Sequence, residues 1–259
     1  MTRSATDAAR IALACLDLTN LNDDATEAQI AMLCERAAPT TARGAVAAVC
    51  VWPRFAKFAR AHAPAQVAVA AVANFPEGSA DVERALRDTD RTVQAGAQEV
   101  DVVLPYRALL AGDAPVCAAL VHAVRRASES LVLKVILETG ELRERALIET
   151  AAQLAIDAGA DFIKTSTGKT RVSATPQAAE AMLGVITRDS RAASRVGFKA
   201  SGGIRSVADA TVYLDLVEAA LGAQALVPTR FRIGASALLG DIDSMLTGAS
   251  GSTSTGATY

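Results

Sequence analysis

Short apolar runs alternate along this chain with longer segments of helical periodicity. Eight runs are rich in small and β-branched residues, and each is followed by a segment whose apolar residues recur every three or four positions. The predicted strands are residues 11–18, 46–52, 67–73, 99–104, 131–137, 162–164, 195–199 and 230–234. We therefore expect eight consecutive units of one strand and one helix.

The predicted helices carry recognisable start and stop signals. Their expected ranges are residues 26–38, 55–61, 80–95, 115–128, 141–158, 176–188, 206–221 and 236–246. Thr26 is a suitable N-cap, and Pro176 suits a first helical turn, where its missing N–H costs nothing. Gly96, Gly159 and Gly222 follow three of the helices and are expected to end them.

The number and character of these units predict the fold. The strands are nearly continuous apolar runs, which is typical of a parallel sheet buried on both faces. Eight units in a chain of this length match a TIM (β/α)8 barrel. An open, doubly wound sheet would show a glycine-rich turn after its first strand, whereas Asp17-Leu18-Thr19-Asn20 contains no glycine. We expect an α/β barrel as one domain of residues 1–246, followed by a flexible tail of residues 247–259.

Composition and charge narrow the class of function. The 259 residues are 51% hydrophobic with a formal net charge of −2, which is enough apolar sequence for one large core. A near-neutral balance without a basic block argues against nucleic acid as the main partner. No apolar run approaches the length of a membrane span, and the polar start lacks the apolar core of a signal peptide. We expect a cytoplasmic protein without membrane segments.

Cysteine and histidine usage predicts neither disulfides nor a metal site. The four cysteines are scattered without a CxxC pair, as expected of reduced thiols; they are Cys15, Cys34, Cys50 and Cys117. His62 and His122 lie beside alanine-rich helical sequence with no cysteine or carboxylate partner nearby. We therefore expect no metal and no cofactor.

Charged residues interrupt strands that are otherwise apolar: Asp17, Asp101, Lys134, Lys164 and Lys199. Chemistry in such barrels collects at the carboxyl ends of the strands, and buried charges there need one another as partners. Burial and a neighbouring cation both lower the pKa of a lysine and free its amine to attack a carbonyl carbon. We interpret Lys164 as the nucleophile, Lys199 as the neighbouring cation and Asp101 as the carboxylate that moves protons.

Simpler explanations exist for each of these charges. Lys164 considered alone could end a strand and extend to solvent. For Asp17 and Lys134, the residues alone favour a structural ion pair over a role in the site. Cys50, in a predicted buried strand, fits a small core residue better than a nucleophile.

Glycine-containing loops at adjacent strand ends indicate an anion site. Residues 165–169 follow Lys164 and offer hydroxyls, backbone N–H groups, Gly168 and the ammonium of Lys169. Barrels often hold phosphate with the loops after strands seven and eight. Those loops contain Gly202 and Gly203, and Gly234 with Ser236. Each glycine alone is more often a plain turn, but together the three loops predict a phosphate cradle.

Seven segments in order along the chain resemble the 2-deoxyribose-5-phosphate aldolase family: LDLTNLNDD (16–24), VCVWPRF (49–55), EVDVVLPYRALLAG (99–112), LKVILETGEL (133–142), GADFIKTSTGK (159–169), VGFKASGGIR (196–205) and FRIGAS (231–236). The resemblance covers nearly the whole chain, and the fifth and sixth segments are the most specific. It implies a metal-free, class I aldolase on a TIM barrel. Such enzymes cleave 2-deoxy-D-ribose 5-phosphate to D-glyceraldehyde 3-phosphate and acetaldehyde through a lysine Schiff base.

The resemblance also implies a role for individual residues. Lys164 matches the Schiff-base lysine, Lys199 the lysine that perturbs it, and Asp101 the proton-relay acid. Asp17 and Lys134 match the supporting polar shell, and Cys50 a cysteine near the aldehyde pocket. The phosphate-holding set is matched by Gly168, Lys169, Gly202, Gly203, Gly234 and Ser236. The terminal Tyr259 is placed to be the family's proton-shuttling tyrosine. Ala237 departs from relatives that carry a second serine there, which removes one phosphate donor.

These expectations leave two alternatives for the function. One is another Schiff-base aldolase or a transaldolase on the same barrel, because fold alone does not set the substrate. The other is a non-catalytic barrel that binds phosphosugars. The expected partners are small phosphosugar and aldehyde substrates, with a homodimer as the expected assembly.

Overall fold

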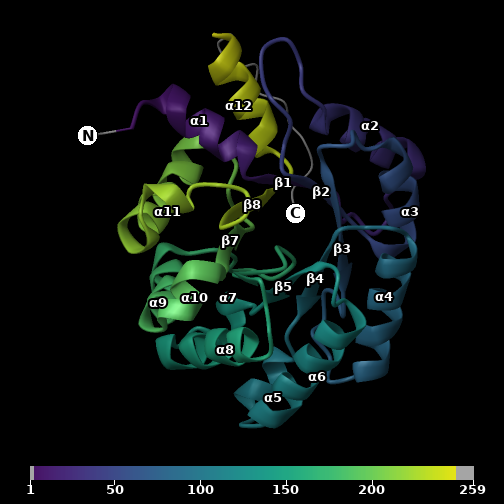
Figure 1. Ribbon diagram of the computed structural model, residues 1–259, viewed down its shortest axis with the longest axis vertical. Helices are drawn as coiled ribbons and strands as arrows, with labels where there is room; N and C mark the ends of the chain where they lie inside the picture. Colours follow the sequence, from purple (N-terminus) through teal and green to yellow (C-terminus); the bar gives the residue numbers. More distant parts are fainter. Residues whose placement is uncertain (1–2, 249–259) are drawn as a thin grey trace.

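Eight parallel strands close into a barrel at the centre of the molecule (Figure 1). The computed structural model describes residues 3–248. Each strand pairs with the next, and β1 also pairs with β8, so the sheet has no free edge. The strands are β1 Leu16–Thr19, β2 Ala48–Val51, β3 Ala68–Ala73, β4 Glu99–Val103, β5 Val132–Ile136, β6 Phe162–Lys164, β7 Gly197–Ser201 and β8 Phe231–Ala235. The predicted TIM barrel is confirmed.

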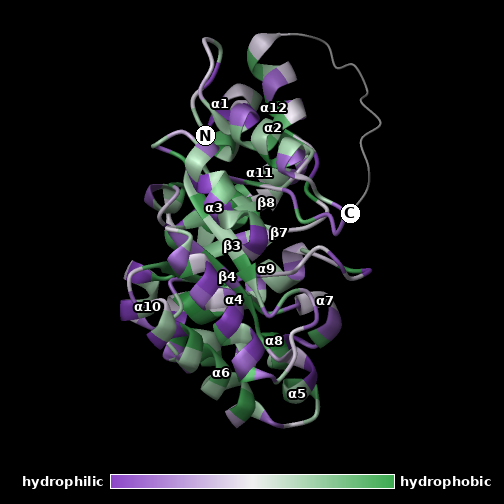
Figure 2. Cartoon of the chain, turned by 90° about the vertical axis from the view of Figure 1, so that its right-hand side faces the viewer, coloured by the Kyte–Doolittle hydropathy of each residue, from purple (hydrophilic) through white to green (hydrophobic). Residues whose placement is uncertain are grey.

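Helices surround the barrel as an outer ring (Figure 1). They are α1 Ala5–Ala14, α2 Glu27–Ala37, α3 Pro53–His62, α4 Val82–Gln94, α5 Tyr106–Leu110, α6 Ala114–Ala127, α7 Thr139–Leu142, α8 Arg145–Asp157, α9 Pro176–Arg188, α10 Ser190–Arg195, α11 Val207–Leu221 and α12 Leu238–Thr247, with a 3-10 turn η1 at Ala223–Ala225. Their ribbons carry both hydrophilic and hydrophobic residues (Figure 2). One face of each long helix can therefore pack on the strands while the other meets water.

Side-chain caps fix where several helices begin. Thr26 and Gln29 form a reciprocal capping box at the start of α2, as Ser206 and Asp209 do for α11. Thr175 accepts from the backbone N–H of Ala178, with a proline at the first position of α9. These bonds satisfy N–H groups that have no partner inside the helix. Local sequence thus sets the ends of the long helices.

The first predicted strand begins too early. Residues 11–14 belong to helix α1, and β1 starts only at Leu16. Ser4 caps this helix by accepting from the N–H of Asp7, and its buried face consists of small alanines and Leu13. An apolar run of this length fits a buried helix as well as a strand. The cap at Ser4 is the signal that distinguishes them.

Other boundaries also differ from the prediction. The helix expected over residues 141–158 is divided into α7 and α8, because Arg143 adopts a positive φ of 58° and interrupts the turn. The strand expected from Arg195 begins at Gly197, since Arg195 ends the short helix α10. The short helix α5, which follows β4, was also not predicted. Such one- or two-turn helices are set by packing more than by periodicity.

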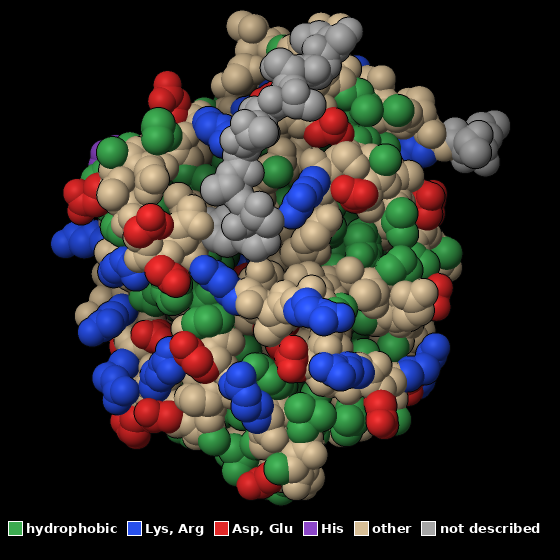
Figure 3. Space-filling view, turned by 180° about the vertical axis from the view of Figure 1, so that it is seen from behind, with side chains coloured by type: hydrophobic (Ala, Val, Ile, Leu, Met, Phe, Trp, Pro, Cys, Tyr) green, Lys and Arg blue, Asp and Glu red, His purple; other side chains and the backbone are tan. Residues whose placement is uncertain are grey.

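Basic and acidic side chains are interspersed on the face shown in Figure 3. Among residues 3–248, no helix combines the length and apolarity needed to cross a membrane.

Candidate active site

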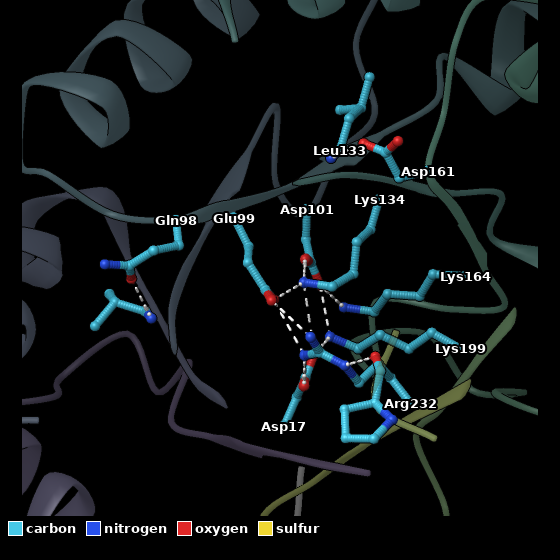
Figure 4. Close-up of polar contacts among 12 residues, drawn as sticks. Asp17, Gln98, Glu99, Asp101, Leu133, Lys134, Asp161, Lys164, Lys199 and Arg232 are labelled. Atoms are coloured by element: carbon cyan, nitrogen blue, oxygen red, sulfur yellow. Dashed lines mark hydrogen bonds and ion pairs between the residues drawn. The ribbon is translucent and has the colours of Figure 1, made fainter. Parts of the chain in front are cut away.

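A group of seven charged side chains meets inside the barrel: Asp17, Glu99, Asp101, Lys134, Lys164, Lys199 and Arg232. They come from six of the eight strands and point toward a common centre (Figure 4). All seven are buried, none more than 6% exposed. We call this group the barrel charge cluster.

Strand geometry explains why these side chains meet. Successive side chains on a strand point to opposite faces, so Glu99 and Asp101 share the inner face of β4. Gln98 points away instead, and its side chain accepts from the backbone N–H of Val69 (Figure 4). Asp101 is aligned with Lys134 on the next strand. The register thereby places opposite charges side by side.

Asp101 is the centre of the cluster and contacts all three lysines. Its Oδ1 accepts from the Nζ of Lys134 at 2.7 Å. Its Oδ2 accepts from Lys164 at 2.9 Å and from Lys199 at 2.7 Å. Lys164 and Lys199 are also register partners on β6 and β7. The two lysines predicted to act together thus reach the same carboxylate oxygen.

Glu99 and Arg232 belong to the cluster, although neither was predicted as a site residue. Arg232 lies 2.5 Å from Asp17 and 2.6 Å from Glu99. Glu99 in turn accepts from Lys134 at 2.5 Å. Both positions precede a predicted site residue by two on the same strand, and this spacing could have identified them. Arg232 ties β8 to β1 and β4 across the barrel.

Burial lowers the pKa of Lys164, because the charged ammonium loses its hydration. Asp101 opposes this shift by favouring the charged form, and the positive charge of Lys199 adds to it. The net result is a pKa below the ordinary lysine value of 10.5. Lys164 is therefore the lysine of the cluster best able to supply a neutral amine.

The pKa values of the other two lysines of the cluster are raised instead of lowered. Burial alone would lower the pKa of Lys199, but Asp101 and Asp17 together raise it. The pKa of Lys134 is raised in the same way by Asp101, Glu99 and Asp17. With Lys164 neutral, the cations Lys134, Lys199 and Arg232 balance the carboxylates Asp17, Glu99 and Asp101. In formal charge, Lys164 is therefore the basic side chain in excess of the acidic ones within the cluster.

The lysines hold Asp101 ionised. Burial would raise the pKa of this carboxyl, but Lys134, Lys164 and Lys199 bring it well below its usual range. Cys50 lies on β2 and is completely buried, and its pKa is raised by burial and by the charge of Asp101. An uncharged thiol is a poor nucleophile, which agrees with the prediction that Cys50 is not the attacking group.

The predicted phosphate loops lie against each other. Gly168, Gly202 and Gly203 have φ angles of 80°, 84° and 81°, which favour glycine. A Cβ added at Gly202 would come within 3.2 Å of the Cα of Gly168 and 2.6 Å of Ser173. Gly202 also donates to the backbone oxygen of Gly234 at 3.4 Å. The loops after β6 and β7 therefore contact each other and the end of β8. Gly234, predicted to lie in the loop after the eighth strand, is a buried residue of β8 itself, because the strand extends to Ala235.

The remaining predicted anion ligands are Ser236 and Lys169. Ser236 is half-buried between β8 and α12. Ala237 occupies the N-cap of α12 and makes no side-chain cap hydrogen bond. The Nζ of Lys169 lies 3.5 Å from Asp23 on the loop after β1.

Glu138 is a further buried charge that was not predicted. It follows β5 in the left-handed conformation, with φ 57° and ψ 56°, and is completely buried. Thr167 and Thr170, on the loop after β6, both donate to its carboxylate. Its position just beyond the end of a strand was the available signal.

Comparisons with known proteins show the family of this chain. Residues 11–242 match the model of the DeoC/LacD family aldolase, which covers most of the chain. This chain belongs to the DeoC/LacD aldolase family. The aldolase is 48% identical over 245 residues to an Agrobacterium fabrum protein named deoxyribose-phosphate aldolase, a match that covers 93% of each chain.

Solved structures agree with the family assignment. A Coccidioides immitis protein assigned as a deoxyribose-phosphate aldolase is 32% identical to this aldolase, with a TM-score of 0.79 over 91% of this chain and 86% of that one. A Toxoplasma gondii protein with the same assignment is 25% identical, with a TM-score of 0.86 over 95% and 98% of the two chains. Tyr259, the predicted proton shuttle, lies outside the described residues of the aldolase.

Proposed function

We propose that this aldolase reversibly cleaves 2-deoxy-D-ribose 5-phosphate to D-glyceraldehyde 3-phosphate and acetaldehyde. The observation that carries the proposal is Lys164, a buried amine of lowered pKa beside the cation Lys199 and the carboxylate Asp101. The 48% identity with a protein named deoxyribose-phosphate aldolase supports the choice of substrate.

Covalent capture by Lys164 is the first step of the proposed mechanism. Its neutral amine adds to carbon 1 of the open-chain sugar, giving a carbinolamine that loses water to form an imine. The protonated imine then accepts the electron pair of the bond between carbons 2 and 3, which breaks. Carbons 1 and 2 remain on Lys164 as an enamine, and carbons 3 to 5 leave as glyceraldehyde 3-phosphate.

Proton transfers complete the cycle. Breaking the bond requires removal of the proton from the hydroxyl on carbon 3, and the ionised Asp101, acting through water, is the proposed acceptor. The enamine is protonated on carbon 2, a step that we assign to water or to Tyr259. Hydrolysis of the resulting imine frees acetaldehyde and restores the amine of Lys164.

The phosphate would bind against the glycine loops after β6 and β7 and the end of β8. Gly168, Gly202, Gly203 and Gly234 would let backbone N–H groups approach the anion closely. Lys169 would supply a positive charge, and Ser236 a hydroxyl at the start of α12. The location above the carboxyl ends of β6, β7 and β8 supports this assignment.

The decisive experiment is a cleavage assay on 2-deoxy-D-ribose 5-phosphate with a chelator present, combined with borohydride trapping. The intact protein is expected to release acetaldehyde and to be trapped covalently by acetaldehyde at Lys164. Lys164→Ala is expected to lose both properties, and a chain lacking Tyr259 to cleave more slowly while still being trapped. Full activity in Lys164→Ala would refute the proposed nucleophile.

The same trapping assay separates the alternatives. A different Schiff-base aldolase or a transaldolase would be trapped by pyruvate or dihydroxyacetone instead of acetaldehyde. A non-catalytic binding barrel would bind the phosphosugar without release of acetaldehyde. The barrel charge cluster favours the catalytic reading, because a binding site has no need of a neutral lysine amine.

We also propose that the protein is cytoplasmic and that it forms a homodimer. The four cysteines, all within the described residues, are free and buried, as is usual in the reducing cytoplasm. We retain the homodimer as a prediction that sedimentation velocity can measure.

A further inference from the structure

We propose that Glu138 is a positioning residue that holds the loop after β6 in the shape needed to bind the substrate phosphate. The inference rests on the proposed function and deepens it, because it assigns selectivity for a phosphorylated sugar to a group that does not touch the substrate. The juxtaposition that carries it is a buried carboxylate under the loop of residues 167–170.

The carboxylate of Glu138 binds both ends of that loop. Oε2 accepts from the hydroxyl of Thr167 at 2.5 Å, and Oε1 accepts from its backbone N–H at 3.3 Å. The hydroxyl of Thr170 lies 3.3 Å from Oε1 and shares its proton between Oε1 and the backbone oxygen of Val172 at 3.1 Å. Two residues that flank Gly168 and Lys169 are thus anchored to a single side chain.

The anchoring continues into the loop itself. The hydroxyl oxygen of Thr167, while donating to Glu138, accepts from the backbone N–H of Lys169 at 3.0 Å. Loss of the carboxylate would free this hydroxyl to rotate and would loosen the turn at Gly168. The loop lies directly against Gly202, so its displacement would also open the second glycine loop.

Glu138 is held in a strained backbone conformation by the hydrogen bonds that flank it. A non-glycine residue in the left-handed region is strained, and such strain persists where the surroundings hold it. Backbone bonds from Leu137 to Lys164 and from Thr139 to Thr165 extend the pairing of β5 and β6 on both sides of Glu138. The side chain is thereby fixed beneath the loop and does not reach solvent.

A carboxylate in this place would repel a phosphate if it were exposed. Glu138 is completely buried, and its charge is turned toward hydroxyl and N–H donors. Its partners are neutral, so it adds order to the loop without neutralising Lys169. These features fit a buried residue that lies under the loop and fixes its conformation without contacting the anion.

The test compares two substrates that differ only in the phosphate. In Glu138→Leu, which cannot accept hydrogen bonds, we expect kcat/KM for 2-deoxy-D-ribose 5-phosphate to fall about tenfold, mainly through KM. We expect kcat/KM for unphosphorylated 2-deoxy-D-ribose and the rate of acetaldehyde trapping at Lys164 to stay unchanged. Inorganic phosphate should also inhibit cleavage of the unphosphorylated sugar less well than in the parent protein.

Glu138→Gln and Glu141→Gln make the test decisive. Glutamine keeps one carbonyl oxygen for Thr167, so Glu138→Gln should give an intermediate loss even if Glu138→Leu does not fold. Glu141 lies three residues further on in α7, and its side chain makes no hydrogen bond or ion pair with the loop among residues 3–248, so Glu141→Gln should behave as the parent.

Three results have distinct meanings. Equal losses on both sugars in Glu138→Gln and Glu138→Leu would overturn the proposal and assign Glu138 a general structural role or an effect on Lys164. Unchanged selectivity for the phosphate in both variants would also overturn it. An unmutated protein that does not cleave the phosphorylated sugar would instead refute the proposed function.

Discussion

At the scale of single residues, the reactivity of Lys164 depends on how the carboxylate of Asp101 is shared among three lysines. Asp101 contacts three lysines, but only Lys164 has a lowered pKa. Lys134 and Lys199 each have a second or third carboxylate partner, whereas Lys164 has Asp101 alone among the ion pairs of the described residues. Lys164 has the fewest carboxylate partners of the three lysines, and its pKa is therefore the one that burial lowers.

This difference predicts the pH dependence of Lys199→Met. Only the neutral amine of Lys164 reacts, so acetaldehyde trapping should rise with pH through the pKa of Lys164, below 10.5. Removing the charge of Lys199 removes one cause that lowers this pKa and frees Asp101 to favour the ammonium. The midpoint of the trapping profile should therefore move to higher pH.

Trapping rates measured across pH provide the check. Lys57→Met is a matched control, because Lys57 is an exposed lysine on α3, away from the barrel interior. Its profile should coincide with that of the parent. A midpoint that stays in place or moves to lower pH in Lys199→Met would show that Lys199 does not perturb Lys164.

At the scale of elements, the alternation of side chains along strands decides which charges meet. Glu99 and Asp101 share one face of β4, and Arg232 shares the inner face of β8 with Gly234. A one-residue shift of either strand would turn these charges toward the helices. Gly197 shows how tightly the interior is filled, since a Cβ there would come within 2.3 Å of the Phe162 ring.

Arg232 is expected to stabilise this arrangement. Arg232→Met removes the cation that Asp17 and Glu99 share across three strands, and leaves both buried carboxylates short of a partner. The free energy of unfolding should fall by about 3–5 kcal/mol. Urea unfolding followed by circular dichroism measures this change.

A surface arginine offers the comparison. Arg188 pairs with Glu149 at 2.7 Å, but its side chain is 57% exposed. Arg188→Met should cost less than about 1 kcal/mol, because water screens the pair. Similar losses in the two variants would contradict the view that burial gives the Arg232 contacts their weight.

At the scale of the whole molecule, the barrel charge cluster joins β1, β4, β5, β6, β7 and β8. Burial would raise the pKa of Asp17 and Asp101, but the surrounding cations lower both below the ordinary 3.8. Their contribution to stability is present above that value and is lost as pH falls through their lower folded-state pKa values. Glu138 has the opposite effect on the pH dependence of stability, because burial raises its pKa and the folded state therefore binds its proton more readily than the unfolded state does.

We therefore expect the free energy of unfolding to decrease as the pH falls below about 4, since two buried carboxyls outweigh one. Urea titrations at a series of pH values measure the effect. The decrease should persist at about 1 M salt, which screens exposed pairs but reaches buried ones much less. A decrease that salt abolishes would assign acid sensitivity to surface pairs instead of the cluster.

The amino-acid pattern alone predicts the barrel, most of its strands and helices, and the charged residues that break the apolar pattern. Hydrophobic periodicity and caps are local signals, so they can be read without coordinates. The division of residues 141–158 was missed, because the positive φ of Arg143 depends on its tertiary surroundings. The helix over residues 5–14 was missed although its cap at Ser4 is a local signal, because its short apolar run fits a strand as well.

Only the tertiary structure decided which charges are partners. Arg232 and Asp17 are 215 residues apart, and Lys199 and Asp17 are 182 apart, yet each pair is in direct contact because the barrel closes β8 on β1. Glu138 and Thr167 likewise meet through the pairing of β5 with β6. The chain fixes which side chains are charged, while closure and register fix the electric environment of each one, and a pKa is a property of that environment.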